Sequence, residues 1–314
     1  MSAPTVVPLT PLDPQYDAGI LRRAIIGSSV DSAAIIGLLT NRTSDQRQEI
    51  LHHYQHSFSQ DLRQDLKNVT GGDFQTVIMA LMTPMNKYLA KEIHRALGSR
   101  GAKERTLIEL LCTRDNASIR AIKDAFYNLY GKSLEEMVQE GTSGSFQELL
   151  IALCSCSRDE RECEAEAIDL AQQLYLAGEG RSRTGEPQLR NILTSLSHKT
   201  LRKVFQEYNK LAGKSFGNLL EEEVTGDSLK GMLAVYSSIQ NPAVFFAEAL
   251  HASMVGLGTR DRTLIRLVVS RSEIDMGDIK VQYHNLYGRT LEKDIKGDTS
   301  GDYKRTLLAL IGAS

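Results

Sequence analysis

The stretch Ala121–Gly144, AIKDAFYNLYGKSLEEMVQEGTSG, aligns without a gap with Asp278–Gly301, DIKVQYHNLYGRTLEKDIKGDTSG. Arg47–Gly71 and Leu201–Gly226 are looser copies of the same stretch. The glycines that close the four copies, at positions 71, 144, 226 and 301, stand 73, 82 and 75 residues apart. Repetition at a nearly fixed period is typical of chains built from repeated structural units. The sequence therefore predicts four repeats of about 75 residues.

A second marker precedes each copy. It is a short, mostly apolar string that occurs at Leu38–Arg42, Leu110–Arg114, Ile192–Leu196 and Leu267–Arg271. The two markers together divide the chain into an N-terminal tail over residues 1–15 and repeats over residues 16–87, 88–162, 163–243 and 244–314.

The composition favours a globular, helical protein. Of the 314 residues, 41% are hydrophobic, 24% are charged and only 6% are aromatic. Four of the seven prolines lie in the first fourteen residues, and the rest of the chain holds only Pro84, Pro187 and Pro242. Proline interrupts helices, so its scarcity after the tail permits helix almost throughout. We therefore expect an extended tail followed by an all-α body.

The fourth repeat shows how helices divide a repeat. Apolar residues at helical spacing predict helices over residues 242–255 and 261–270. Ser272 and Asp275 read as a capping box that opens a third helix, which ends at Gly288. A fourth helix is expected from Thr290 to about residue 295, and a fifth after Gly301. Five short helices with short links favour antiparallel neighbours.

Charge and hydropathy exclude several classes of protein. A net charge of −2 gives no general attraction to nucleic acid, so no nucleic-acid partner is expected. No apolar run approaches the length of a membrane span, and the N-terminus shows no secretory signal. We therefore expect a cytoplasmic protein whose four cysteines are reduced thiols.

Most motif-like strings have ordinary explanations. Cys154 and Cys156 favour core packing over a metal or redox pair. His52 and His56, one helical turn apart, leave a zinc site open beside the interpretation as a polar helix surface. Nothing resembles a pair of nucleophile and base, so we expect no enzyme.

Two strings, Gly131-Lys132-Ser133 and Gly213-Lys214-Ser215, echo the end of a phosphate-binding loop. The upstream glycine that such a loop requires is missing in both places. We expect instead a glycine that ends one helix and a serine that caps the next.

One group of residues has the pattern of a binding site. Met254-Val255-Gly256-Leu257-Gly258-Thr259 stands where a helix ends, and Asp298 stands in the equivalent turn of the repeat's second helix pair. Glycine allows a turn that leaves backbone carbonyls free, although an ordinary helix cap would explain Gly256 by itself. Helix pairs packed side by side would bring the two turns to one end. Carbonyl oxygens and a carboxylate together form the kind of cage that suits Ca²⁺.

These residues carry a family resemblance. The sequence resembles the annexins over residues 16–314, in its four repeats and in the motif G-x-G-T followed after 38 residues by an acid, here Gly256–Thr259 and Asp298. The resemblance implies five helices per repeat in a curved, disc-like array that binds acidic phospholipid membranes peripherally through Ca²⁺. It also implies the ligands: the carbonyls of Met254, Gly256 and Gly258 with the Asp298 carboxylate, and a weaker accessory site at Thr259 and Asp261.

The other three repeats depart from the motif. Repeat 1 has Val69 at the acid position, and repeat 2 has Gly141 there, with Glu140 one residue away as an alternative carboxylate that could reach the site. Repeat 3 keeps the acid as Glu223, but Arg183 stands where the second glycine belongs. An arginine there would repel a divalent ion or pair with Glu223. We therefore expect calcium binding mainly in repeat 4.

The degenerate loops of repeats 2 and 3 are basic, at Arg100, Lys103, Arg181 and Arg183. Such residues could meet anionic lipid without calcium, or could be ordinary surface charge. The alternative function is therefore a cytosolic helical scaffold with partly decayed calcium sites, which binds anionic lipid through these loops or protein partners through its surface or tail. The intact motif of repeat 4 favours calcium-dependent membrane binding over this alternative.

Overall fold

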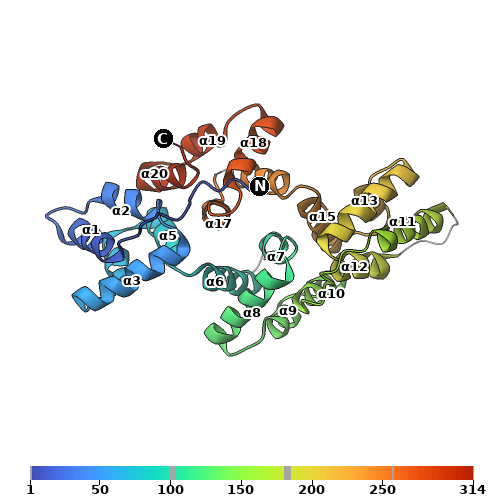
Figure 1. Cartoon of the computed structure of the whole chain (residues 1–314), viewed down its shortest axis with the longest axis horizontal. Coiled ribbons are helices and arrows are strands. Elements are labelled where there is room, and N and C mark those ends of the chain that lie inside the picture. The colour runs from blue at the N-terminus through green and yellow to red at the C-terminus, as the bar shows by residue number, and fades with distance from the viewer. Residues whose placement is uncertain (1, 99–102, 180–184, 257, 314) are drawn as a thin grey trace. The chain divides into compact units, whose positions relative to one another are not determined.

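The computed structural model describes residues 2–98, 103–179, 185–256 and 258–313, and in these ranges the secondary structure is helical without a strand (Figure 1). The predicted all-α fold is confirmed. The first repeat contains α1 (Pro14–Ile26), α2 (Ser32–Leu39), α3 (Ser44–Phe58), α4 (Leu62–Val69) and α5 (Gly72–Leu81). The second contains α6 (Met85–Gly98), α7 (Lys103–Leu111), α8 (Asn116–Tyr130), α9 (Leu134–Gly141) and α10 (Gly144–Cys154).

The second half of the chain repeats this order. The third repeat contains α11 (Glu164–Glu179), α12 (Glu186–Ser195), α13 (His198–Ala212), α14 (Phe216–Glu223) and α15 (Gly226–Gln240). The fourth contains α16 (Pro242–Met254), α17 (Asp261–Arg271), α18 (Met276–Tyr287), α19 (Leu291–Asp298) and α20 (Gly301–Leu310). The prediction of five helices in each repeat is therefore confirmed.

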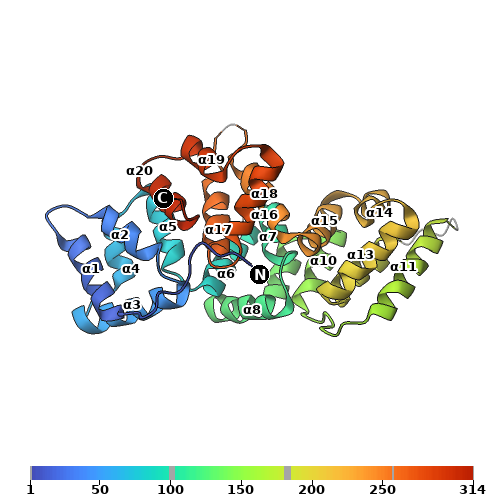
Figure 2. The ribbon, with the colours of Figure 1, turned by 45° about the horizontal axis from the view of Figure 1, so that its top comes forward.

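The repeats pair into two compact units that adjacency in the sequence does not suggest. One unit joins Met1–Tyr88 to Ala243–Ser314, and the other is Leu89–Pro242. In the first unit α2 packs on α20, α17 packs on α5, and α5 packs on α20 (Figures 1 and 2). The second unit uses the same positions, with α7 on α15, α12 on α10 and α10 on α15. Each unit thus joins two repeats reciprocally through their second and fifth helices.

Local sequence explains where the helices begin and end. Gly131 and Gly213 take left-handed backbone conformations, with φ of +67° and +65°, and end α8 and α13. Ser133 and Ser215 then cap α9 and α14, each in a reciprocal capping box. The two strings that echo a phosphate-binding loop are therefore helix junctions, as expected.

Two details of the predicted repeat are corrected. The glycine with positive φ at the start of each fifth helix is Gly72 in the first repeat, not Gly71 (φ +57°, against +62°, +66° and +59° in the others). Ser272 and Asp275 form no capping box: α18 begins at Met276 without a side-chain cap. The Asp275 carboxylate instead accepts hydrogen bonds of 2.8 and 2.6 Å from the buried guanidinium of Arg271. A buried guanidinium requires a counter-charge, and Asp275 supplies it.

The N-terminal tail lies against its own unit. The Thr5 and Val6 amides donate to the carbonyl of Ser272, at 2.8 and 3.0 Å, and the Thr5 hydroxyl donates to the carbonyl of Leu310 at 2.6 Å. The Gln46 side chain exchanges two hydrogen bonds with the backbone of Leu9, and Val6 is buried. The tail therefore ties repeat 1 to repeat 4.

Candidate functional site: the loop between α16 and α17 with Asp298

The loop after α16 has a backbone that only glycine adopts readily. Gly256 has φ of +114° and Gly258 has φ of +82°. A Cβ atom at either position would meet nothing within 4 Å, so the need for glycine comes from backbone strain and not from crowding. The Arg260 amide closes the loop by donating to the carbonyl of Ser253 at 2.8 Å.

Thr259 joins this loop to the end of α19. Its hydroxyl lies 3.2 Å from the carbonyl oxygen of Asp298 and 3.3 Å from the carboxylate oxygen Oδ2 of the same residue. Asp298 is the last residue of α19, and its side chain is exposed. Two turns that lie about forty residues apart in the sequence therefore meet at one point.

The donor set suits a hard divalent cation. No residue that the structure describes donates a hydrogen bond to the carbonyl oxygen of Met254, Gly256 or Gly258, so these oxygens are available as ligands. The Asp298 carboxylate adds a negative charge beside them. Carbonyl and carboxylate oxygens are the ligands that Ca²⁺ takes, with water completing the shell. Among the described residues no three His, Cys, Asp or Glu side chains form a metal cluster.

Asp261, predicted as part of an accessory site, lies half-buried in the first turn of α17. Burial raises the pKa of its carboxyl group, and the neighbouring charges of Asp73 and Asp298 add to the rise, while the Tyr303 hydroxyl acts against it. Neighbouring carboxylates favour a cation nearby, because the cation offsets their repulsion.

Repeat 1 does not bring together an equivalent set, and the loop of repeat 2 over residues 99–102 lies outside the described residues. In repeat 1 Gly27 has φ of −62°, and the acid position holds the half-buried Val69. In repeat 2 a Cβ at Gly141 would lie 3.0 Å from Cδ2 of Leu97, so that position is packed against the end of α6. The neighbouring Glu140 forms an ion pair of 2.9 Å with Lys132.

Repeat 3 and the basic loops are described only in part. Glu223 ends α14 and is half-buried, whereas Arg181 and Arg183 lie outside the described residues. Arg100 of repeat 2 also lies outside them, and Lys103 begins α7 with its side chain undescribed. The other metal prediction, His52 with His56, falls on two exposed side chains of α3.

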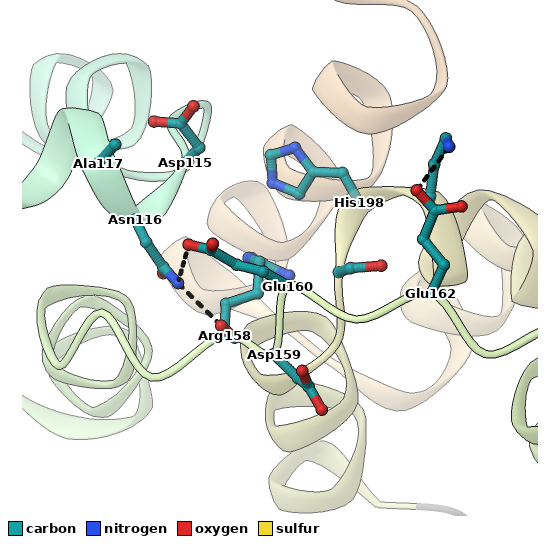
Figure 3. A pocket seen from close by; sticks show the side chains of 10 residues that line it. Asp115, Asn116, Ala117, Arg158, Asp159, Glu160, Glu162 and His198 are labelled. Carbon is teal, nitrogen blue, oxygen red and sulfur yellow. Dashed lines mark hydrogen bonds and ion pairs between the residues drawn. The ribbon is translucent and has the colours of Figure 1, made fainter.

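A pocket in the second unit was missed by sequence reasoning. It encloses about 360 Å³ where the starts of α8 and α13 face the segment that links repeats 2 and 3 (Figure 3). Its residues come from three distant stretches, 115–117, 158–162 and 197–199, so no local pattern marks it. The Asn116 amide donates to the carbonyl of Arg158 at 2.8 Å, and Lys199 pairs with Glu162 at 2.5 Å.

Burial lowers the pKa values of two side chains in this pocket. Burial lowers the pKa of His198 to about 4, and the nearby cations of Arg158 and Arg202 add to this effect. Burial also lowers the pKa of Arg158 to about 10. Asp115 caps α8 through the Ser118 amide at 2.8 Å. These polar side chains interact mainly with one another and with backbone groups at helix ends. We therefore interpret them as contacts that join repeat 2 to repeat 3.

All four cysteines are free thiols, and Cys112, Cys154 and Cys156 are buried, in keeping with a packing role. Among the described residues, no helix is both long enough and apolar enough to cross a membrane.

Comparison with known proteins gives one consistent family. The family model for annexins matches residues 16–81, 88–153, 169–235 and 245–310. The chain is 41% identical to annexin A11 of Oryctolagus cuniculus over 316 aligned positions, which cover 99% of this chain and 62% of that protein. It thus spans about three fifths of the length of annexin A11. It is 39% identical to annexin B10 of Drosophila melanogaster over 99% of this chain and 98% of that one.

Solved annexin structures superpose closely on this chain. Annexin III superposes with a TM-score of 0.94 at 37% identity, over 99% of this chain and 97% of that one. Calcium-bound annexin (Sm)1 superposes with a TM-score of 0.92 at 32% identity, over 99% and 93% of the two chains.

Proposed function

The chain belongs to the annexin family, whose members bind phospholipid in a calcium-dependent manner, and from this premise we propose that its fourth repeat carries that activity. The observation that supports this most directly is the pair of contacts from Thr259 to Asp298, which join a loop of free carbonyls to an exposed carboxylate. At the position of this carboxylate the first repeat has Val69 and the second has Gly141.

The residues of the site have separate parts in this proposal. The positive φ angles of Gly256 and Gly258 keep the loop in a turn whose carbonyls form no internal hydrogen bonds. The Thr259 hydroxyl holds the carboxylate of Asp298 against that turn. A bound Ca²⁺ supplies open coordination positions that a phosphate oxygen of an acidic phospholipid can take. The protein would then sit on the membrane surface peripherally, which we propose is a cytoplasmic one.

The test is co-sedimentation with vesicles of phosphatidylserine and phosphatidylcholine, in calcium and in chelator. Wild type is compared with Asp298→Asn, which removes the charge but keeps the shape, and with Glu140→Gln as the matched control. Glu140 is an exposed carboxylate at the end of the equivalent helix of repeat 2. We expect calcium-dependent binding of wild type and control, with the Asp298→Asn variant needing at least about tenfold more calcium.

Other outcomes would redirect the proposal. Equal binding of all three proteins in calcium would remove repeat 4 as the site. Binding that persists in chelator and falls with added salt would move the function to the basic loops. Absence of binding in every condition would favour the alternative function, a helical scaffold that binds protein partners. A partner that binds the N-terminal tail would then have to recognise tail residues that are exposed.

A further inference from the structure

Arg158, in the segment that links repeats 2 and 3, is a buried cation without a counter-charge among the described residues. It is only 9% exposed, and burial lowers the pKa of its guanidinium to about 10 with no carboxylate opposing that effect. The one hydrogen bond that its side chain forms with a described residue runs from Nη1 to the carbonyl oxygen of Leu196. The buried Arg47 of the first unit differs, because it pairs with Glu273 at 2.8 Å. A buried charge that lacks a partner lowers stability, so Arg158 calls for an anion.

Arg158 lines the pocket of about 360 Å³ described above, and two helix starts supply further donors there. Helices α8 and α13 have 15 residues each, and Figure 3 shows Ala117 of α8 on one side of the pocket and His198 of α13 on the other. The caps of the two helices accept from the third amide of each, at Ser118 and Thr200. The amides of residues 116, 117, 198 and 199 donate to no described residue. Free amides at the positive end of a helix dipole are donors for oxyanions.

The charge acting on His198 is positive although carboxylates also line the pocket. Burial lowers the pKa of His198 most, the cations of Arg158 and Arg202 lower it further, and Asp115 opposes them without reversing the shift. The four carboxylates of the pocket all have partners: Asp115 caps α8, Asp159 pairs with Arg161, Glu160 accepts from Asn116, and Glu162 pairs with Lys199. The guanidinium of Arg158 is therefore the charge left to neutralise. The surrounding carboxylates limit the ligand to a small one, because they would repel a polyanion.

We propose that this pocket binds a small oxyanion, the phosphate or carboxylate group of a soluble molecule, between the Arg158 guanidinium and the first turns of α8 and α13. The planar guanidinium matches the geometry of both groups. The segment that carries it is held in place, because the Asn116 side chain donates to the Arg158 carbonyl at 2.8 Å and the Asp159 amide donates to the Ser195 carbonyl at 2.6 Å. The ligand would join repeat 2 to repeat 3. The site lies wholly within the second unit and does not depend on the proposed function.

The first test is calorimetric titration with inorganic phosphate or with acetate, in chelator and at an ionic strength held constant with chloride. We expect saturable binding of at least one of the two anions, with a Kd of about 1 mM or lower. Ala117→Glu adds a negative charge at an exposed position of the pocket and should weaken binding by at least about tenfold. Ala121→Glu is the matched control, at an exposed position of α8 outside the pocket, and should bind like wild type.

Thermal unfolding tests Arg158 itself. Wild type should melt about 3 °C higher with the bound anion at saturation than in chloride alone, because a ligand that binds only the folded state stabilises it. Arg158→Met removes the cation and should melt at one temperature in both conditions. Circular dichroism checks that this variant is folded, and the two alanine variants keep the test valid if it is not. Equal anion affinity of Ala117→Glu and Ala121→Glu would overturn the proposal. So would heats that never saturate with either anion, which would mean an adventitious ion only.

The second test reports the position and the source of the anion. His198 lines the pocket, so its imidazole signals in a histidine-labelled protein should move on addition of the bound anion, whereas those of the exposed His52 should not. The His198→Asn variant assigns the signals. Unmoved His198 signals at saturation would place the anion elsewhere and overturn the proposal. Phosphatidylserine vesicles in chelator should leave the anion affinity unchanged. Competition by the vesicles would assign the site to a lipid headgroup and overturn the proposal of a soluble ligand.

Discussion

Gly256 and Gly258 show how single residues define the candidate site. Both have the space for a side chain, yet both have φ angles that an L-amino acid seldom adopts. The free carbonyls of the loop depend on this backbone, because a loop of ordinary φ angles would turn its carbonyls differently.

Gly256→Ala should therefore weaken calcium binding with little effect on the fold. Holding alanine at φ near +114° costs about 1–3 kcal/mol, which corresponds to an affinity loss of about 5- to 150-fold. Titration calorimetry with calcium measures the loss. The control is Gly37→Ala in α2, at a glycine with equal space and no positive φ, which should leave calcium binding unchanged. Wild-type affinity in Gly256→Ala would show that the loop does not hold the ion.

Arg47 is a second decisive residue, in the core of the first unit. Its guanidinium is 1% exposed and pairs with Glu273 at 2.8 Å, while it also donates to the carbonyls of Leu81 and Leu39. Burial lowers its pKa, and the charge of Glu273 opposes that effect.

Glu273→Gln should destabilise the protein by about 2–3 kcal/mol, because it leaves a buried cation without its counter-charge. Urea unfolding followed by circular dichroism measures the change. Glu140→Gln removes a carboxylate from an exposed ion pair and should change the stability by less than about 0.5 kcal/mol. Equal effects of the two substitutions would mean that the Arg47 pair does not contribute as its burial suggests.

At the scale of the element, helix ends determine much of the local structure. The start of α13 is unusual because it places a histidine in a largely buried position. Ser197 caps the helix. The next residue, His198, lies close to the charges of Asp115, Arg158 and Arg202. The folded state holds this histidine neutral, with its pKa lowered from 6.5 to about 4. The unfolded chain binds a proton there as the pH falls below 6.5, so acid favours unfolding.

Between pH 7 and pH 5 this single group should reduce the stability by about 1–2 kcal/mol. The contribution is fully present above pH 6.5 and is lost progressively as the pH falls towards 4. Urea unfolding at the two pH values measures it, and His198→Asn should show a correspondingly smaller difference. His52→Gln, at an exposed position of α3, should keep the pH dependence of wild type. A pH dependence unchanged by His198→Asn would contradict this assignment.

At the scale of the whole molecule, the tail binds the ends of the sequence together. Gly277 is a point of close approach: a Cβ there would lie 2.7 Å from the carbonyl oxygen of Ala3, which accepts a hydrogen bond from the Gly277 amide at the same distance. The Ala3 amide in turn donates to Asp278 at 2.9 Å.

Gly277→Ala should release the tail and reduce the stability by about 1–3 kcal/mol, because the added methyl group overlaps the tail backbone. Hydrogen–deuterium exchange measures the release, since the Thr5 and Val6 amides are bonded to Ser272 only while the tail is in place. Gly297→Ala, at a glycine of α19 with nothing within 4 Å, is the control and should leave their exchange slow. Slow exchange in Gly277→Ala would show that the tail tolerates the methyl group.

The sequence by itself determined the features that depend on local spacing. Four repeats, five helices in each and the helix junctions at Gly131 and Gly213 all follow from periodicity and capping, which act over a few residues. The prediction that Asp298 meets the glycine loop also came from spacing, because equivalent turns of packed helix pairs fall at one end.

Only the tertiary structure decided which distant groups meet. The spacing of the repeats could not show that the first pairs with the fourth, nor that Asp275 serves the buried Arg271 and not a helix start. It also could not show that residues from 115, 158 and 197 enclose a pocket, or that the tail covers Gly277. These outcomes depend on burial, since removing a charge or an amide from water makes its partner obligatory, and burial is settled only when the whole chain has packed.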